Sequence, residues 1–142
     1  MIRVESFTDH PNRRIRHDEI RKTARAVLRG EGAADVTLRV IFTGDAAMKR
    51  LHRVWLDKPT TTDVLTFPLE SGRGKPLDAE IYVNLDQCRR QARDVGVSDR
   101  HEIARLVVHG SLHLVGFRDS TPALRRTMRA REDLYLRRLD VR

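Results

Sequence analysis

Hydrophobic and polar residues alternate, or form short apolar runs, in four stretches of the chain, and each predicts a β-strand. These stretches are residues 1–6, 35–42, 64–67 and 80–84. Apolar residues recur at helical spacing in five longer stretches, at residues 12–29, 45–55, 85–94, 99–115 and 121–138. Strands and helices interleave early and helices alone follow, which favours an α+β (α/β-like) fold. We therefore expect one domain over residues 1–142, a small mixed four-stranded sheet packed with about five helices.

Residues that favour turns set the expected ends of these elements. Asp45 is a suitable N-cap for the second helix, and Pro68 is expected to stop the third strand. Residues 58–62 are expected to form a polar loop, and residues 70–78, with two glycines and a proline, a mobile connection between strands. Gly116 is expected to end the fourth helix with a positive φ angle.

Composition limits the class of protein. The 142 residues are enough to bury one hydrophobic core. No run approaches the roughly 18 apolar residues that span a bilayer, and the N-terminus lacks the apolar segment of a secretory signal. We therefore expect a cytoplasmic protein with no membrane partner. The single cysteine, Cys88, cannot form an internal disulfide, and we interpret it as a small packing residue and not as a nucleophile.

The balance of charge favours a polyanionic partner, above all nucleic acid. The chain has 28 Lys and Arg against 20 Asp and Glu, a formal net charge of +8. Nearly all of the basic residues are arginine, which is equally compatible with a soluble basic surface that binds nothing. With few aromatic residues to stack on bases, Trp55 and Phe67 are interpreted as core residues.

The arginines of the last predicted helix could bind the phosphates of a nucleic acid along its length, or they could form an ordinary solvated face. Its basic residues are Arg125, Arg126, Arg129, Arg131, Arg137 and Arg138. The apolar positions expected to form its one buried stripe are Leu124, Met128, Leu134 and Leu139.

The segment HGSLHLVGFRD has the pattern of a transition-metal site. His109 and His113 are four residues apart, so both imidazoles lie on one face of the predicted helix. A reversal at Gly116 could carry Asp119 back toward them. Three protein ligands with an open position are typical of catalytic zinc. Alternatively, the two histidines share a face by chance, and Asp119 is a capping residue or an indirect partner.

A zinc protease of the H-E-x-x-H class is a competing interpretation. In that motif the glutamate after the first histidine is the general base. Here Gly110 follows His109, so this base is missing. The absence argues against a protease, and the net charge argues against a small-molecule or peptide substrate.

At these residues the chain resembles the YbeY-type endoribonucleases, or rRNA maturation factors. The family signature H-G-x-L-H-L-x-G-[YF]-D-H matches from His109 to Phe117, and the family segment T-D-V-L-S-F-P is similar to residues 62–68. The resemblance covers roughly residues 35–138. It implies a zinc-dependent endonuclease of single-stranded RNA, one ion per chain, which processes the 3′ end of 16S rRNA with the small ribosomal subunit. No DNA substrate is expected.

Two positions depart from the family pattern. The third histidine ligand of the family falls on Asp119, with Arg118 before it, and an arginine that is thought to serve catalysis falls on Leu56. Two histidines and a carboxylate are still a known zinc ligand set, so the chain is interpreted as a variant branch with His109, His113 and Asp119 as metal ligands. His52, where the family has asparagine, is the competing third ligand.

Arg118 and Arg53 are the candidates for offsetting charge on a phosphodiester transition state. The loss of the family arginine at Leu56 leaves a second hypothesis open, that of a non-catalytic ribosome assembly factor with a structural metal. The oligomeric state is not predicted.

Overall fold

A computed structural model describes residues 1–56, 62–70 and 75–142, which form a four-stranded mixed sheet and five helices. The strands are β1 (Ile2–Thr8), β2 (Val36–Thr43), β3 (Val64–Glu70) and β4 (Leu77–Asn84). The helices are α1 (His17–Gly30), α2 (Asp45–Leu56), α3 (Leu85–Val95), α4 (Asp99–Leu114) and α5 (Pro122–Leu139). The predicted α+β class, with its small mixed sheet and about five helices, is confirmed.

The sheet has the strand order β1-β2-β4-β3. β1 and β4 each pair parallel with β2, and β3 pairs antiparallel with β4 at the edge of the sheet. Parallel pairing brings the carboxyl ends of β2 and β4 side by side, with Thr43 opposite Asn84. β3 is the last strand of the sheet, so one of its edges has no partner strand within the sheet. It also contacts helix α4.

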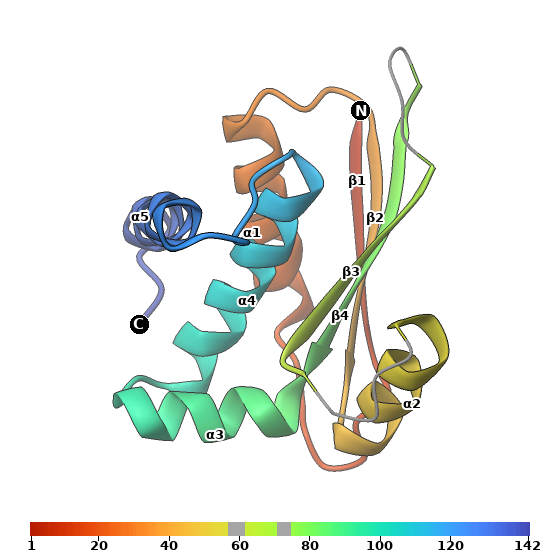
Figure 1. Cartoon of the computed structure of the whole chain (residues 1–142), viewed down its shortest axis with the longest axis vertical. Helices are drawn as coiled ribbons and strands as arrows, with labels where there is room; N and C mark the ends of the chain where they lie inside the picture. The colour runs from red at the N-terminus through yellow and green to blue at the C-terminus, as the bar shows by residue number, and fades with distance from the viewer. Residues whose placement is uncertain (57–61, 71–74) are drawn as a thin grey trace.

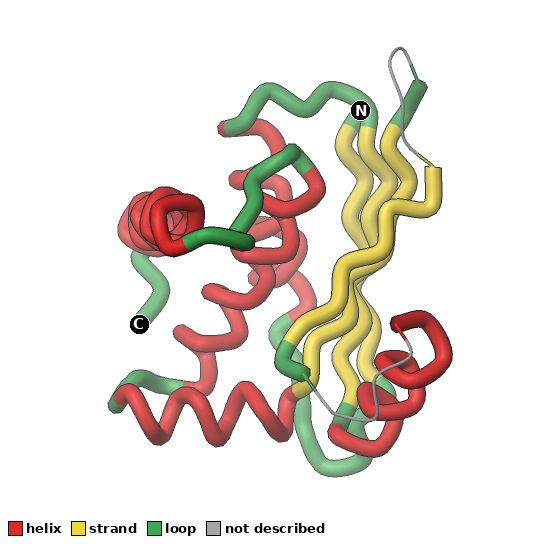
Figure 2. Tube along the Cα trace, viewed as in Figure 1, coloured by secondary structure: helices red, strands yellow, loops and turns green. Residues whose placement is uncertain are grey.

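Most helices cover one face of the sheet (Figure 1). α1 and α4 pack against it, α5 packs on the far side of α4, and α2 lies on the opposite side of the sheet. Figure 2 shows the same separation of the helical layer from the strands. One apolar core lies between the sheet and the helices, with Val40, Ile81 and Leu106 in it, and a second joins α4 to α5 through Leu112 and Met128. α4 is therefore buried on two sides.

Several boundaries differ from the sequence prediction. α1 begins at His17 and not at residue 12. β3 does not stop at Pro68 but continues to Glu70, since an edge strand tolerates proline, which lacks a backbone N–H group. β4 begins at Leu77, inside the predicted connection 70–78. Residues 71–74 of that connection and residues 57–61, which include most of the predicted polar loop, lie outside the described residues.

Two predictions about apolar side chains were wrong in part. Trp55 is 67% exposed near the end of α2, where its ring contacts the half-buried Phe67 at 6.1 Å between centroids. On α5, Met128 is buried and Leu139 packs against the second core as predicted, but Leu124 is exposed, and the other buried residues are Glu132, Tyr135 and Leu136. Cys88 is buried, and burial raises the pKa of its thiol to about 12, which agrees with a packing role. In the part of the chain that the structure describes, no helix is long and apolar enough to cross a bilayer.

Candidate metal centre

Helix α4 carries the two histidines of the motif. The Ser98 hydroxyl accepts a hydrogen bond from the His101 N–H group and caps its first turn. Apolar side chains of α4 project from most of its faces, so the helix packs between the sheet and α5. Gly110 allows this close approach, because a Cβ atom there would lie 3.0 Å from the side chain of Ile81 on β4. The glycine beside His109 thus sets the distance between the two candidate ligand histidines and the sheet.

The turn after α4 reverses the chain. Val115 is the C-cap residue, and Gly116 has a φ of 104°, in the region that glycine adopts without strain. The Phe117 N–H group then donates to the Leu112 carbonyl, which closes the turn. The reversal places Asp119 beside the C-terminal half of α4, as the sequence predicted.

His109, His113 and Asp119 bring three ligand atoms together. The two Nε2 atoms are 3.1 Å apart, and the Asp119 Oδ2 atom lies 3.5 Å from Nε2 of His109 and 3.4 Å from Nε2 of His113. Ligands at about 2.0–2.1 Å from a tetrahedral ion are themselves separated by about 3.3 Å. The triangle therefore has the size that one zinc-sized ion requires, and among the described residues no other set of His, Cys, Asp or Glu has this geometry.

The opposite nitrogen of each imidazole is already in use. His113 Nδ1 lies 3.0 Å from the Phe117 carbonyl oxygen, and His109 Nδ1 lies 2.9 Å from the Glu132 carboxylate on α5. A carbonyl and a carboxylate can only accept, so Nδ1 is the donor in both rings, and each ring in its neutral form presents an Nε2 lone pair to the triangle. Two lone pairs and a carboxylate oxygen converge, an arrangement that a cation stabilises.

Glu132 is a buried carboxylate that the fold keeps ionised. It is 2% exposed, and burial alone would raise its pKa, but the hydrogen bond with His109 and the charge of Arg105 outweigh burial and lower it. The Arg105 guanidinium donates to Glu132 at 3.2 Å and to Glu102 at 2.5 and 2.7 Å. The acceptor for the His109 imidazole is thus an anion at physiological pH.

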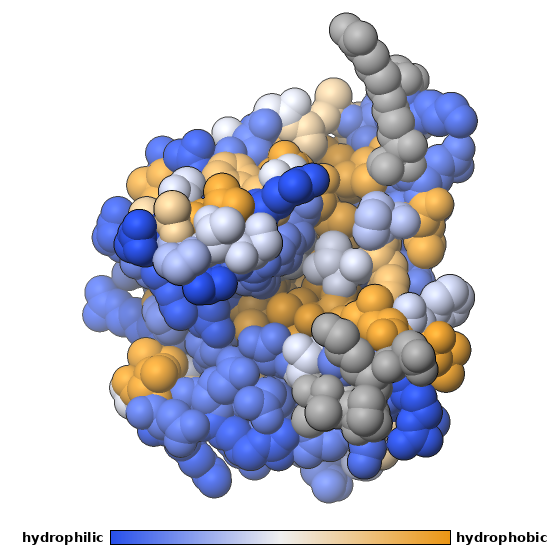
Figure 3. Space-filling model, viewed as in Figure 1, coloured by the Kyte–Doolittle hydropathy of each residue, from blue (hydrophilic) through white to orange (hydrophobic). Residues whose placement is uncertain are grey.

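The three candidate ligands lie along a groove of about 550 Å³ between α4 and the edge strand β3. Residues from the TDVL segment and β3 form the facing wall, at Thr62, Asp63, Val64, Leu65, Thr66 and Pro68. Figure 3 shows a hollow between the helical layer and the sheet, with hydrophobic surface in orange at its bottom. A substrate in the groove would therefore contact both family-like segments of the sequence at once.

Neither predicted arginine is among the described residues that line this groove. Arg118 is exposed beside Asp119 in the turn. Arg53 is exposed on α2, on the opposite side of the sheet, and is not among the described residues of the groove wall. Leu56, at the position of the family arginine, is 46% exposed at the end of α2. His52 is buried on α2 and does not join the three ligand atoms.

Three contacts near the site were missed from the sequence. Glu132 and Arg105 support His109 as described, and Arg125 of α5 donates to the Asp119 carbonyl oxygen at 3.2 Å. Glu132 had a detectable signal, because it continues the helical stripe of Met128 and Leu136 as a charged residue among apolar ones. Arg105 lies four residues before His109 on the same face of α4. No pattern pointed to Arg125 beyond its membership of a basic helix.

Comparison with known proteins identifies the family. The family model described as endoribonuclease YbeY matches residues 6–140. The chain belongs to the YbeY endoribonuclease family. It is similar to the endoribonuclease YbeY of Salinibacter ruber, at 36% identity over 90% of this chain and 86% of that one. It is also similar to that of Chlorobaculum tepidum, at 38% identity over 81% and 82%.

A solved structure supports the fold. The chain matches the solution structure of TM1509 from Thermotoga maritima with a TM-score of 0.67 and 25% identity, over 98% of this chain and 89% of that one. Within the YbeY family the two-histidine, one-aspartate set departs from the third histidine that the signature leads one to expect. Two imidazole nitrogens and a carboxylate oxygen nevertheless fit zinc and other first-row divalent ions.

Proposed function

We propose that this member of the YbeY endoribonuclease family is a metal-dependent hydrolase of single-stranded RNA. One ion per chain, zinc by first preference, would be held by His109, His113 and Asp119. The observation that carries the proposal is the triangle of ligand atoms, 3.1 to 3.5 Å on each side, along an open groove.

The donor set suits phosphodiester hydrolysis. A divalent ion at such a site lowers the pKa of water toward about 7 and polarises a phosphoryl oxygen. The chain itself supplies the oriented imidazoles and two cationic side chains near the ligand turn, Arg118 in the turn and Arg125 on α5. These guanidinium groups would offset charge on a bound phosphate. Arg53 remains a candidate to contact the phosphates of RNA that lies across α2, away from the groove.

We propose ribosomal RNA as the substrate, with the 3′ end of 16S rRNA on the small ribosomal subunit as the target, in the cytoplasm. The family supports an RNA substrate, and the net charge of +8 supports binding to a polyanion. The exposed arginines of α5 adjoin the metal site through Arg125, so RNA bound along this helix would lead toward the groove.

A non-catalytic assembly factor is the second candidate. Leu56 favours it, because the family arginine is missing at this position. In that case the ion would hold α4 and the following turn together and would not act on RNA. The two candidates make the same prediction for metal content and opposite predictions for RNA cleavage.

The test compares three identically prepared proteins, wild type, His113→Ala and His101→Ala. His101 lies on the same helix outside the ligand triangle, and its Nδ1 atom has no hydrogen-bond partner in the described structure. We expect about one zinc per chain, by mass spectrometry, and cleavage of single-stranded rRNA fragments for wild type and His101→Ala, and neither for His113→Ala. Equal cleavage by wild type and His113→Ala would reveal a contaminating nuclease. Zinc without cleavage, on free RNA and on subunits, would favour the assembly factor.

A further inference from the structure

A row of charged side chains, two buried and one half-buried, contacts the candidate metal ligand His109 without lining the groove. Glu132 of α5 and Glu102 of α4 are each 2% exposed, and Arg105 lies between them. Buried charges cost free energy unless they are paired and hydrogen-bonded. Here every member is paired, so the row is a well-ordered part of the fold.

One guanidinium group holds both carboxylates. Arg105 donates with Nε and Nη2 to Glu102 and with Nη1 to Glu132, at 3.2 Å. Gln91 of α3 donates to Glu102 at 2.9 Å, which connects the row to a third helix. The second Glu132 oxygen accepts from His109 Nδ1 at 2.9 Å. The orientation of the His109 ring is thus fixed from three helices.

The two histidines differ in what their Nδ1 atoms require. His113 is near the end of α4, where the chain turns, and the Phe117 carbonyl is available to it. His109 is inside the helix, where backbone carbonyls are engaged in helical hydrogen bonds. It therefore needs an acceptor from a side chain, and Glu132 provides one.

Packing alone does not explain a charge at position 132. Met128 and Leu136, one turn before and one turn after, are buried apolar residues on the same stripe of α5. An apolar residue would continue this stripe, and replacing buried ion pairs by packed apolar residues is often neutral or stabilising. The carboxylate is instead placed where it meets a metal ligand.

We infer that Glu132 and Arg105 are the positioning pair of the metal centre. Glu132 holds His109 in the tautomer that presents the Nε2 lone pair to a divalent ion, and Arg105 holds Glu132 in place. The inference rests on the proposed function only in requiring that the triangle binds a metal, and it makes no claim about RNA.

The experiment measures zinc affinity, by competition with a chromophoric chelator, and the tautomer of His109 in metal-free protein, by NMR of ¹⁵N-labelled histidine. The variants are Glu132→Met, which removes the acceptor, Glu132→Gln, which keeps an acceptor without charge, and Arg105→Met. Glu31→Gln is the matched control. Glu31 also binds α5, through Tyr135 and Arg131, but does not touch the metal ligands.

We expect wild type and Glu31→Gln to carry the His109 proton on Nδ1 and to bind zinc equally. Glu132→Met should weaken zinc binding about 10- to 100-fold and lose the Nδ1–H tautomer, with smaller effects for Glu132→Gln and Arg105→Met. If Glu31→Gln also loses zinc affinity, the loss in the Glu132 variants reflects a general disturbance of α5, and the inference is overturned.

Wild-type affinity and an unchanged tautomer in Glu132→Met would also overturn it, while the nuclease proposal would stand. If the variants show the expected zinc affinities but wild type does not cleave RNA, the nuclease proposal is wrong and the positioning pair is still supported. If wild type binds no zinc or other divalent ion, both proposals fail. Should Glu132→Met not fold, the tautomer and affinity of Glu132→Gln decide.

Discussion

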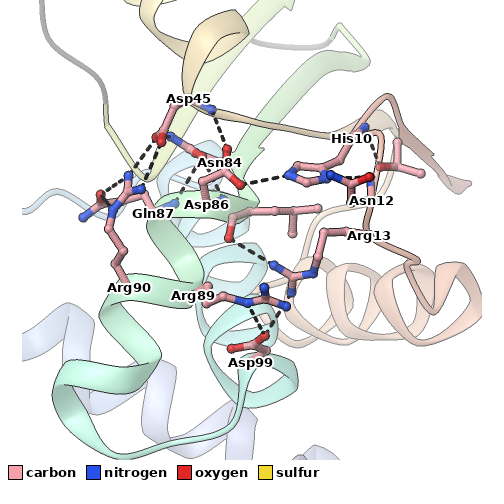
Figure 4. A network of polar contacts seen from close by, with 12 residues as sticks. His10, Asn12, Arg13, Asp45, Asn84, Asp86, Gln87, Arg89, Arg90 and Asp99 are labelled. Atoms are coloured by element: carbon pink, nitrogen blue, oxygen red, sulfur yellow. Dashed lines mark hydrogen bonds and ion pairs between the residues drawn. The ribbon is translucent and has the colours of Figure 1, made fainter.

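Two polar clusters at different places in this molecule are built from similar side chains and differ in how their charges are paired. The strand-end cluster consists of His10, Asp45, Asn84, Asp86 and Arg90, at the carboxyl ends of β2 and β4 (Figure 4). The metal triangle consists of His109, His113 and Asp119. Both contain imidazole and carboxylate groups within hydrogen-bond distance.

In the strand-end cluster every carboxylate meets donors. Asp45 accepts from Arg90 at 2.7 and 2.9 Å and from the Asn84 amide at 2.9 Å. Asp86 accepts from His10 at 2.9 Å and from the Asp45 N–H group at 3.0 Å. The donors and acceptors of this cluster are paired with one another. The cluster therefore links β2, α2, β4 and α3, and its carboxylates need no bound ion to balance them.

In the metal triangle, atoms that can accept hydrogen bonds face one another. The supporting contacts with Glu132 and Phe117 make Nδ1 the donor in both rings, so the neutral imidazoles turn their Nε2 lone pairs toward the triangle. The contrast shows that a polar cluster points to a bound ion when its internal contacts leave lone pairs converging, and to a role in stability when donors and acceptors match.

The largest expected effect concerns the third ligand. Asp119→Ala should lose more zinc affinity than the about 10–100-fold typical of a supporting residue, because it removes a ligand atom. Its metal-free stability should change by no more than about 0.5 kcal/mol, since Asp119 is partly exposed. Asp119→His, which restores the family ligand, should recover zinc binding. Chelator competition and urea denaturation measure both quantities, and zinc affinity equal to wild type in Asp119→Ala would remove Asp119 from the ligand set.

A stability effect without a metal effect is expected for Asn84→Ala. The Asn84 side chain caps α3 by accepting from the Asp86 and Gln87 N–H groups, and it donates to Asp45 and to the Thr62 carbonyl. Loss of the cap and of buried partners should cost about 2–4 kcal/mol of unfolding free energy. Zinc affinity should stay within twofold of wild type. A large loss of zinc affinity would show that the two clusters are coupled and that the contrast between them is wrong.

The smallest expected effect is a pH dependence in the strand-end cluster. The hydrogen bond from His10 lowers the pKa of Asp86 below its ordinary value of 3.8, and the Asp45 N–H group adds to this. A carboxyl group whose pKa falls on folding stabilises the native state above pH 3.8, and this contribution is lost as the pH falls through the lower folded value. Asp86→Asn should therefore be less stable than wild type at pH 7, by about 0.5–1 kcal/mol for a partly exposed group. Urea denaturation from pH 7 to pH 3 measures the difference, which should shrink below pH 3.8; a constant difference would contradict the assignment.

The sequence by itself determined the order and type of the elements and the helix that carries the two candidate ligand histidines. Helical spacing puts His109 and His113 on one face whatever surrounds them, and a glycine after the helix permits the reversal that returns Asp119. These are local properties of the backbone, so they can be predicted from short stretches of residues. The class of fold followed from the same local patterns.

The tertiary structure decided everything that depends on contacts between distant segments. Pro68 continues a strand because β3 is an edge strand, and Trp55 is exposed because α2 leaves it outside the core. Arg53 belongs to α2, which lies on the opposite side of the sheet from α4, although its place in the sequence suggested a position near the site. Glu132, on the next helix, contacts His109 from 23 residues further along the chain. Pairing between strands and contacts between helices depend on the whole arrangement of the chain, which no local pattern of residues specifies.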